Sequence, residues 1–214
     1  VLLEYCQNNK INLFGVSAKY IDHLKNEKFN SNHLDLTSIK IIASTGSPLS
    51  EESFRYVYEN IKKDVHLASI AGGTDMVGCL VLGNLYSNVF KGEIQGQSLA
   101  IDVDVFTDDG KSTKDGEKGE LVVKQPFPSM PIKFWGDESG EKYHKAYFTR
   151  FKNIWHHGDF IERTSNNGFI MRGRSDSTLN PGGVRIGTSE IYQQVEDLSL
   201  IHISEPTRRS WISY

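Results

Sequence analysis

The chain has 214 residues, a formal net charge of −3 and 38% hydrophobic residues, which fits one or two globular domains with a sizeable core. The slight acidic excess gives no indication of a nucleic-acid partner, because DNA- and RNA-binding domains usually carry a basic excess. No apolar run approaches the roughly 20 residues of a membrane span, and Cys6 and Cys79 lack the spacing of a disulfide framework or zinc site, so free thiols in a reducing compartment are expected.

The first part of the chain alternates between helix and strand. Helices are predicted over residues 1–8, 18–27 and 50–63, and strands over residues 11–17, 38–45 and 64–69. The run SIKIIAST is typical of a strand buried on both faces. Ser50 is expected to cap the third helix, ahead of an apolar stripe. The stripe consists of Phe54, Val57, Tyr58 and Ile61. Strands separated by helices predict parallel βαβ units.

A different pattern begins after about Leu82. Apolar residues alternate over residues 101–106, and a second strand, GELVVKQ, follows after the turn signal DDG. Residues 159–164 and 169–174 are predicted to form a hairpin around the turn SNNG. These strands predict an antiparallel sheet or a small barrel. Residues 126–151 are expected to be a long connection, in which the many aromatic side chains serve packing.

Three polar clusters follow this outline: STGSPLS (44–50), SIAGGTD (69–75), and a third from HHGD to GTSEI (156–191). The first two stand at carboxyl ends of predicted parallel strands, where ligands bind in open sheets. Glycines allow close approach to the backbone, a Thr hydroxyl can donate to phosphate, and an Asp carboxylate can hold Mg²⁺. Each cluster alone is also compatible with a turn or a helix cap, and the adjacent histidines lack metal-ligand spacing. Their order and spacing together are far more specific.

Together these motifs resemble the adenylate-forming superfamily of acyl-CoA synthetases, luciferases and peptide-synthetase adenylation domains. The resemblance also includes KGEIQG, PFPSMPIKFW, KAYFTRF and GRSDSTLNPGGVRIGTSEIY, and it covers residues 1–197. It implies an α/β fold that is part of the large adenylate-forming domain, with a stub of the small C-terminal domain. The large domain would span residues 1–175, with a parallel αβ layer over 1–82 and a β-rich subdomain over 83–175. The hinge and the start of the small domain would span residues 176–197.

The resemblance implies an adenosine site. The segment Gly46, Ser47 and Pro48 would wall the adenine pocket. Asp159 would accept hydrogen bonds from the ribose hydroxyls, which suits a carboxylate facing a diol. Arg174 would reach the ribose or the phosphate. Read without the resemblance, Asp159 is a turn residue and Arg174 is a surface arginine paired with Asp176.

The resemblance also implies the groups around the reacting phosphate. Gly73 and Thr74 would contact the nucleotide, with the Thr74 hydroxyl at the α-phosphate. Asp75 would serve Mg²⁺. Arg185 would face the phosphate, where a guanidinium offers paired donors. Thr74, Asp75 and Arg185 are therefore the expected catalytic residues.

Further roles concern the acid, the hinge and coenzyme A. Thr45 and Gly72 would border the acyl pocket. Gly72 stands where acetyl-CoA synthetases carry a tryptophan, so room for a longer acid is expected and Gly72→Trp is expected to favour acetate. Asp176 matches the hinge between the large and small domains. Gly183 matches the glycine that lets the pantetheine arm pass.

The implied activity is AMP-forming acid–thiol ligation, with acetoacetate, ATP and coenzyme A as small-molecule substrates and Mg²⁺ as the metal. A cytosolic (cytoplasmic) location is implied, with no nucleic acid, no membrane span and no protein partner. The alternatives are a synthetase for another short-chain acid and a non-catalytic nucleotide-binding module. The family's phosphate loop and catalytic lysine would lie before Val1 and beyond residue 197, so the chain is expected to be an internal fragment that is inactive alone.

The last part of the sequence departs from the family pattern. Residues 198–208, LSLIHISEPTR, resemble the translation of a transposase mosaic-end sequencing adapter. We therefore expect residues 198–214 to be a non-native tail. The alternative is a genuine amphipathic terminus.

Overall fold

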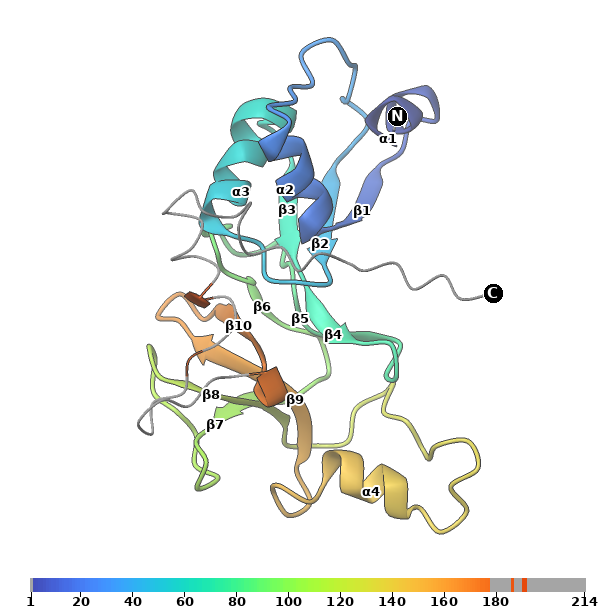
Figure 1. The fold of residues 1–214 in the computed structure, drawn as a ribbon, viewed down its shortest axis with the longest axis vertical. Helices are drawn as coiled ribbons and strands as arrows, with labels where there is room; N and C mark the ends of the chain where they lie inside the picture. The colour runs from blue at the N-terminus through green and yellow to red at the C-terminus, as the bar shows by residue number, and fades with distance from the viewer. Residues whose placement is uncertain (1, 178–185, 187–189, 192–214) are drawn as a thin grey trace, which may run out of the picture.

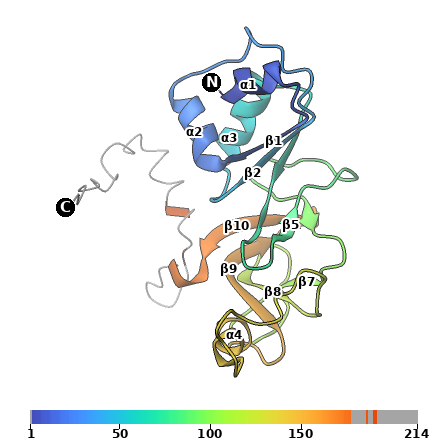
Figure 2. The same cartoon turned by 90° about the vertical axis from the view of Figure 1, so that its right-hand side faces the viewer.

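The fold is taken from a computed structural model, which describes residues 2–177, 186, 190 and 191. A parallel sheet of three strands, in the order β1-β2-β3, forms one half of it (Figure 1). The strands are Leu13–Ser17 (β1), Ile41–Thr45 (β2) and His66–Ser69 (β3), and the helices are Leu2–Asn8 (α1), Ala18–Asn26 (α2) and Glu51–Tyr56 (α3), the last continued by a π-helix over Val57–Ile61. All three α-helices lie on the same side of this sheet (Figure 2). The prediction of parallel βαβ units is confirmed.

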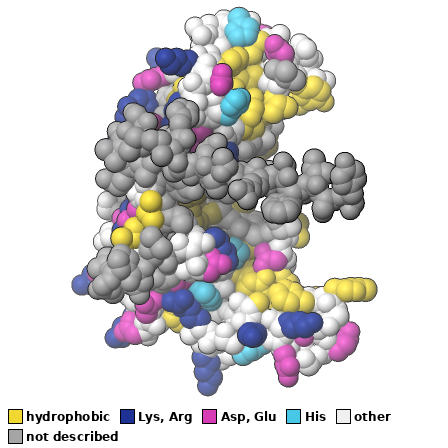
Figure 3. All heavy atoms as spheres, viewed as in Figure 1, with side chains coloured by type: hydrophobic (Ala, Val, Ile, Leu, Met, Phe, Trp, Pro, Cys, Tyr) yellow, Lys and Arg dark blue, Asp and Glu magenta, His cyan; other side chains and the backbone are white. Residues whose placement is uncertain are grey.

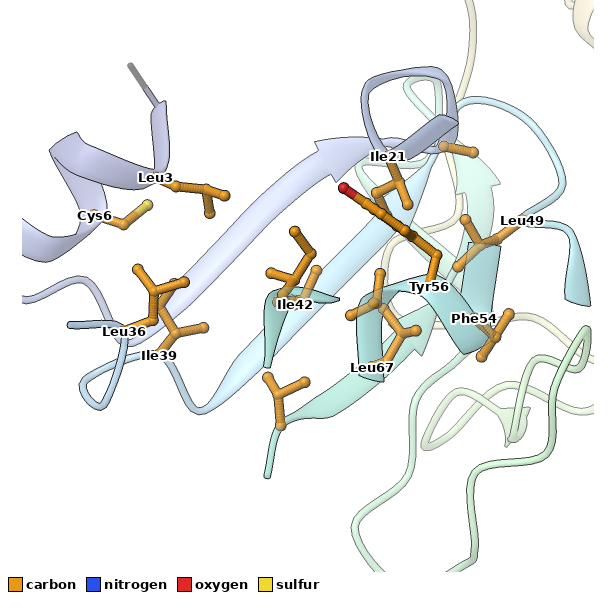
Figure 4. Close-up of a cluster of buried hydrophobic side chains, with 14 residues drawn as sticks. Leu3, Cys6, Ile21, Leu36, Ile39, Ile42, Leu49, Phe54, Tyr56 and Leu67 are labelled. Atoms are coloured by element: carbon orange, nitrogen blue, oxygen red, sulfur yellow. The ribbon is translucent and has the colours of Figure 1, made fainter. Parts of the chain in front are cut away.

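The core of this half lies between the helices and the sheet (Figure 4). Ser50 caps α3 as expected, because its side chain accepts a hydrogen bond of 3.2 Å from the Ser53 N–H. Ile42 of β2 is buried in the core, whereas its neighbours Ile41 and Ala43 are only partly buried. The prediction that this strand is buried on both faces is therefore wrong, because the helices among the described residues cover one face of the sheet.

A small antiparallel sheet connects the two halves. The strands Ala71–Gly73 (β4) and Gly78–Leu82 (β5) form a hairpin, and Gly96–Gln97 (β6) pairs with β5. β4 begins directly after β3 in the chain. Ile70, between the two strands, donates its N–H to the Ser44 carbonyl of β2 at 2.9 Å. The start of this hairpin is thus held next to the carboxyl ends of β2 and β3.

The second half is an antiparallel sheet of four strands in the order β10-β9-β8-β7. The strands are Val103–Phe106 (β7), Lys118–Val123 (β8), Trp155–Arg163 (β9) and Phe169–Arg174 (β10), and a short 3-10 helix, Ser175–Ser177, follows. The predicted antiparallel strands and the hairpin are confirmed. A second hydrophobic core, from Met76 to Phe169, belongs to this half. The first core ends at Leu67, so the change from one core to the other falls between these positions.

One helix lies in the segment that was predicted to be an irregular connection. Residues Glu141–Tyr147 form α4, whose first turn is fixed by a buried carboxylate: the Tyr143 N–H donates to Oδ2 of Asp137 at 2.9 Å. The prediction missed this helix because the run of prolines and aromatic residues before it dominated the pattern. The helical spacing of Tyr143, Ala146 and Tyr147 was the signal that indicates it.

Candidate functional site

A cavity of about 430 Å³ opens where the turn of the β4–β5 hairpin meets α4 and the β9–β10 hairpin. The described residues that line it are Gly72, Gly73, Asp75, Ala146, Tyr147, Arg150, His156, His157, Gly158, Arg174, Ser175 and Asp176. In the face shown in Figure 3, basic, acidic and histidine side chains lie on both halves of the molecule, including the half that contains the antiparallel sheet. The cavity thus joins the second and third polar clusters of the sequence, which lie far apart along the chain.

The turn of the β4–β5 hairpin brings a carboxylate to the cavity. Asp75 is exposed in this turn, and its Oδ2 accepts a hydrogen bond from the hydroxyl of Tyr147 in α4. A Cβ atom on Gly73 would lie 2.0 Å from Oδ1 of Asp75 and 3.0 Å from the His157 ring. Only a glycine lets the carboxylate and the imidazole lie this close to the backbone, which explains the glycine before Thr74 and Asp75 in the second polar cluster.

Gly72 is held by a different contact. A Cβ atom at this position would lie 2.1 Å from the Gly78 carbonyl oxygen and 2.5 Å from the Cys79 Cα, both in the backbone of β5. Gly72 lines the cavity, but the missing side chain makes room for the neighbouring strand. The close contact with β5 therefore explains why a glycine is needed at this position, independently of the size of an acyl group. A tryptophan here has to displace the β5 backbone.

Asp159 lies in β9 behind the wall of the cavity and is only 7% exposed. Its Oδ1 accepts a hydrogen bond of 3.2 Å from Nη1 of Arg174, and its Oδ2 lies 3.7 Å from Nε2 of His157. Burial raises the pKa of the Asp159 carboxyl, while the charges of His157 and Arg174 act to lower it and that of Glu120 acts to raise it. The carboxylate is thus held by a cation from the neighbouring strand.

Arg174 connects the predicted ribose residue with the predicted hinge. Its guanidinium contacts Asp159 and also lies 3.8 Å from Oδ1 of Asp176, while the side chain remains 54% exposed. The pairing with Asp176 was the alternative reading of this arginine, and the structure shows both contacts at once. A Cβ atom on Gly158 would lie 2.7 Å from Nη2 of Arg174, so this glycine, at φ +82°, allows the guanidinium to cross the strand.

The cavity wall also contains one aromatic side chain, Tyr147, that sequence reasoning assigned to packing. The ring of Tyr147 stacks on that of Trp155 at 3.6 Å and 12° between planes. Nε1 of Trp155 donates to Nδ1 of His157 at 3.3 Å. Tyr147 therefore packs and contacts the cavity at the same time, whereas Tyr143 donates its hydroxyl to the Pro131 carbonyl at 2.5 Å. Tyr147, Arg150, His156 and His157 line the cavity and are functional candidates to which the sequence analysis gave no site role.

Several predicted site residues lie elsewhere. Thr45 ends β2 and Gly46, Ser47 and Pro48 follow it, at the same sheet edge as the start of β4, but none of these residues lines the cavity. Thr74 is exposed in the hairpin turn and is likewise not in the cavity wall. Arg185 and Gly183 lie outside the described residues, as does the predicted non-native tail.

The described residues form no cluster of three or more His, Cys, Asp or Glu side chains that suits a metal ion. Mg²⁺ is usually bound through one or two carboxylates together with substrate phosphates and water, so it does not require such a cluster. Asp75 and Asp176 are exposed carboxylates that line the cavity, and Asp75 is the one that the sequence predicts for Mg²⁺. No helix among the described residues is long and apolar enough to cross a membrane.

Comparison with known proteins identifies close relatives. No protein-family model matches the chain. The chain is 56% identical over 199 residues to the acetoacetyl-coenzyme A synthetase of Rhizobium meliloti (strain 1021) and 46% identical to the acetoacetyl-CoA synthetase of Gallus gallus; in each case the match covers 92% of the chain and 30% of the relative. The chain thus spans about 30% of the length of the curated relatives it matches.

Two solved structures have the same architecture. Acetoacetyl-CoA synthetase from Streptomyces lividans matches with a TM-score of 0.81 and 38% identity, covering 90% of this chain and 30% of that structure. The anthranilate CoA ligase AuaEII in complex with anthranoyl-AMP matches with a TM-score of 0.72 and 18% identity, covering 89% of this chain and 35% of that structure. The second likeness shows the fold alone.

Proposed function

We infer that the whole protein is an AMP-forming acetoacetate–CoA ligase. The chain is homologous to a segment of the acetoacetyl-CoA synthetases and has the fold of adenylate-forming enzymes. In the first half-reaction, a carboxylate oxygen of acetoacetate attacks the α-phosphorus of ATP and pyrophosphate leaves. In the second, the thiolate of coenzyme A attacks the acyl carbon, and AMP leaves as the thioester forms. Both steps require that charge around the phosphate be neutralised and that the reactants be held in line.

The observation that carries this proposal is the convergence of Gly73, Asp75, Arg174 and Asp176 in one cavity. The second and third polar clusters supply these residues from distant parts of the chain, as a shared ligand requires. A guanidinium that is half exposed suits a phosphate or a ribose, because it offers several donors in a fixed plane. Asp75 would hold Mg²⁺, which would neutralise phosphate charge, with Tyr147 fixing the orientation of the carboxylate.

Asp159 is proposed as the ribose residue, with Arg174 beside it. The contact between Nη1 of Arg174 and Oδ1 of Asp159 supports this role, because it fixes the carboxylate directly behind a residue that lines the cavity. A ribose diol would replace part of that contact, which the exposure of Arg174 permits. The roles of Gly46, Ser47 and Pro48 at adenine, Thr74 at the α-phosphate, Arg185 at the phosphate, Thr45 and Gly72 at the acid, Asp176 at the hinge and Gly183 at coenzyme A remain part of the same proposal, as does a cytosolic location.

The test uses the full-length protein that carries this chain. Acetoacetate-dependent exchange of pyrophosphate into ATP is expected, followed by AMP formation when coenzyme A is added. Acetate, propionate and 3-hydroxybutyrate serve as competing acids, and a preference for one of them would replace acetoacetate as the substrate. Binding of ATP without exchange for any acid would favour a non-catalytic nucleotide-binding module and overturn the ligase assignment.

A further inference from the structure

Glu120 is a carboxylate with no exposed surface, yet it contacts three polar side chains. It lies in β8, and Oε1 is 3.2 Å from Nη2 of Arg150. Oε2 is 2.9 Å from Nε2 of His156 and also accepts a hydrogen bond from the Ser175 hydroxyl. Burying a carboxylate costs free energy unless both of its oxygens are paired, and these contacts pair both oxygens of Glu120. The carboxylate in turn fixes the three side chains that contact it.

These three partners of Glu120 have one property in common. Arg150, His156 and Ser175 all line the cavity, whereas Glu120 does not. They come from three different segments: the loop after α4, strand β9 and the 3-10 helix after β10. Ser175 directly precedes Asp176, the predicted hinge residue. One buried carboxylate thus connects three parts of the cavity wall.

A comparison within the same sheet shows that this arrangement is more than an ordinary buried ion pair. Asp104 in β7 is also a buried carboxylate, 4% exposed, and it pairs with Arg163. It accepts further hydrogen bonds from the Ser112 hydroxyl at 2.7 Å and the Val105 N–H at 2.8 Å. None of these partners lines the cavity. The two carboxylates therefore share burial and charge, and they differ in what they hold.

The charge of Glu120 also reaches the predicted ribose residue. Besides burial, which is the main cause, Glu120 is among the groups that raise the pKa of Asp159, while His157 and Arg174 act in the opposite direction. Glu120 is thus electrostatically connected with the cavity in addition to its direct contacts.

We propose that Glu120 is a positioning residue of the nucleotide site, which orients Arg150 and His156 toward the phosphate-bearing substrate and fixes Ser175 beside the hinge. This inference rests on the proposed function. Arg150 is also bound by Asp108, at 2.7 Å. Glu120 adds a second anchor on the same nitrogen and so restricts the guanidinium to the cavity wall. Without it, Arg150 is free to follow Asp108 toward solvent.

The test compares Glu120→Gln with the matched control Asp104→Asn in the full-length protein. Glutamine keeps the size of the side chain but removes the charge and places an N–H₂ group where a donor is now bound. We expect the KM for ATP in pyrophosphate exchange to rise about tenfold, since hydrogen bonds to charged groups are the strong ones. Asp104→Asn is expected to lower the melting temperature and leave this KM within about twofold.

A second variant and a binding measurement keep the test decisive. Glu120→Asp retains the charge on a shorter side chain, so it should fold and raise the KM by an intermediate factor. Calorimetric titration of the unchanged protein with ATP tests the proposed function by itself. The positioning role is wrong if the unchanged protein binds ATP and Glu120→Gln shows the same KM for ATP as Asp104→Asn. If Glu120→Gln does not fold, Glu120→Asp takes its place in this comparison.

Discussion

The hydroxyl of Tyr147 donates a hydrogen bond to Oδ2 of Asp75, and this contact joins α4 to the turn of the β4–β5 hairpin. The ring of Tyr147 is fixed at the same time by its stacking on Trp155. Burial and the hydrogen bond to Asp75 raise the pKa of the Tyr147 hydroxyl, so it stays a donor throughout the physiological range. The carboxylate proposed to serve Mg²⁺ is therefore oriented by a rigid aromatic side chain.

The first prediction concerns this contact. Tyr147→Phe keeps the stacking on Trp155 and removes only the donor to Asp75. A hydrogen bond to a charged group contributes about 1.5–3 kcal/mol, so the KM for MgATP in the full-length protein is expected to rise by about tenfold or more. Steady-state pyrophosphate exchange at varied MgATP measures this effect.

Tyr143→Phe provides the control. Tyr143 lies in the same helix and donates its hydroxyl to the Pro131 carbonyl, away from Asp75. Its loss should reduce stability and leave the KM for MgATP unchanged. Equal KM values for the two variants would contradict a role of Tyr147 in orienting Asp75.

The second prediction concerns Asp159 as the ribose residue. Asp159→Ala removes an acceptor for the ribose hydroxyls and leaves Arg174 without its buried partner. Loss of a charge-assisted hydrogen bond of about 1.5–3 kcal/mol corresponds to an ATP affinity that is weaker by one to two orders of magnitude. Isothermal titration with ATP measures it directly, and an unchanged dissociation constant would reject the ribose role.

The third prediction concerns stability and pH. Burial raises the pKa of Asp159, so the folded state binds this proton more tightly than the unfolded chain does. The stabilisation is present below the pKa of the unfolded carboxyl and is lost as the pH rises through the raised folded pKa. Asp159→Asn carries no charge at any pH. The melting temperature of this variant minus that of the unchanged protein should therefore increase from about pH 4 to about pH 8.

Asp104→Asn should show the opposite sign. Burial acts to raise the pKa of Asp104, but hydrogen bonds from Ser112 and Val105 and the charges of Arg163 and Lys124 lower it overall. Its stabilisation is present above the unfolded pKa and is lost as the pH falls. The melting-temperature difference for this variant should become more negative as the pH rises from about 2 to about 5, because the lowered pKa places the change at and below the pKa of the unfolded carboxyl. Parallel curves for the two variants would show that the carboxylates are not in the opposed environments described above.

The fourth prediction concerns Gly72. A Cβ atom would meet the β5 backbone at 2.1 Å, so Gly72→Ala should destabilise the protein by about 1–3 kcal/mol, as overpacked sites do. Gly15→Ala in β1 is the control, because nothing lies within 4 Å of its added Cβ atom. Chemical unfolding measures both variants. A Gly72→Trp variant with unchanged stability and a higher acetate-to-acetoacetate ratio of kcat/KM would restore the acyl-pocket explanation of this glycine.

Local features of the sequence determined the helices and strands of the parallel layer, the Ser50 cap and the β9–β10 hairpin. Apolar periodicity and turn residues act over a few neighbouring positions, so they can be read without knowing the fold. The motifs that contain Gly73 and Asp75, and Arg174 and Asp176, are also short, so they too can be recognised without knowing the fold. Where a local signal was mixed, as in the proline-rich segment before α4, the helix was missed.

The contacts that make a site out of these motifs were decided by the tertiary structure. Tyr147 meets Asp75 across 72 positions of the chain, and Ser175 meets Glu120 across 55. Glu120 looks like an outward-facing polar residue in an alternating strand, yet the loop after α4 and the end of β10 cover it. Burial and the pairing of distant side chains depend on which segments pack together, and no periodicity within one segment contains that information.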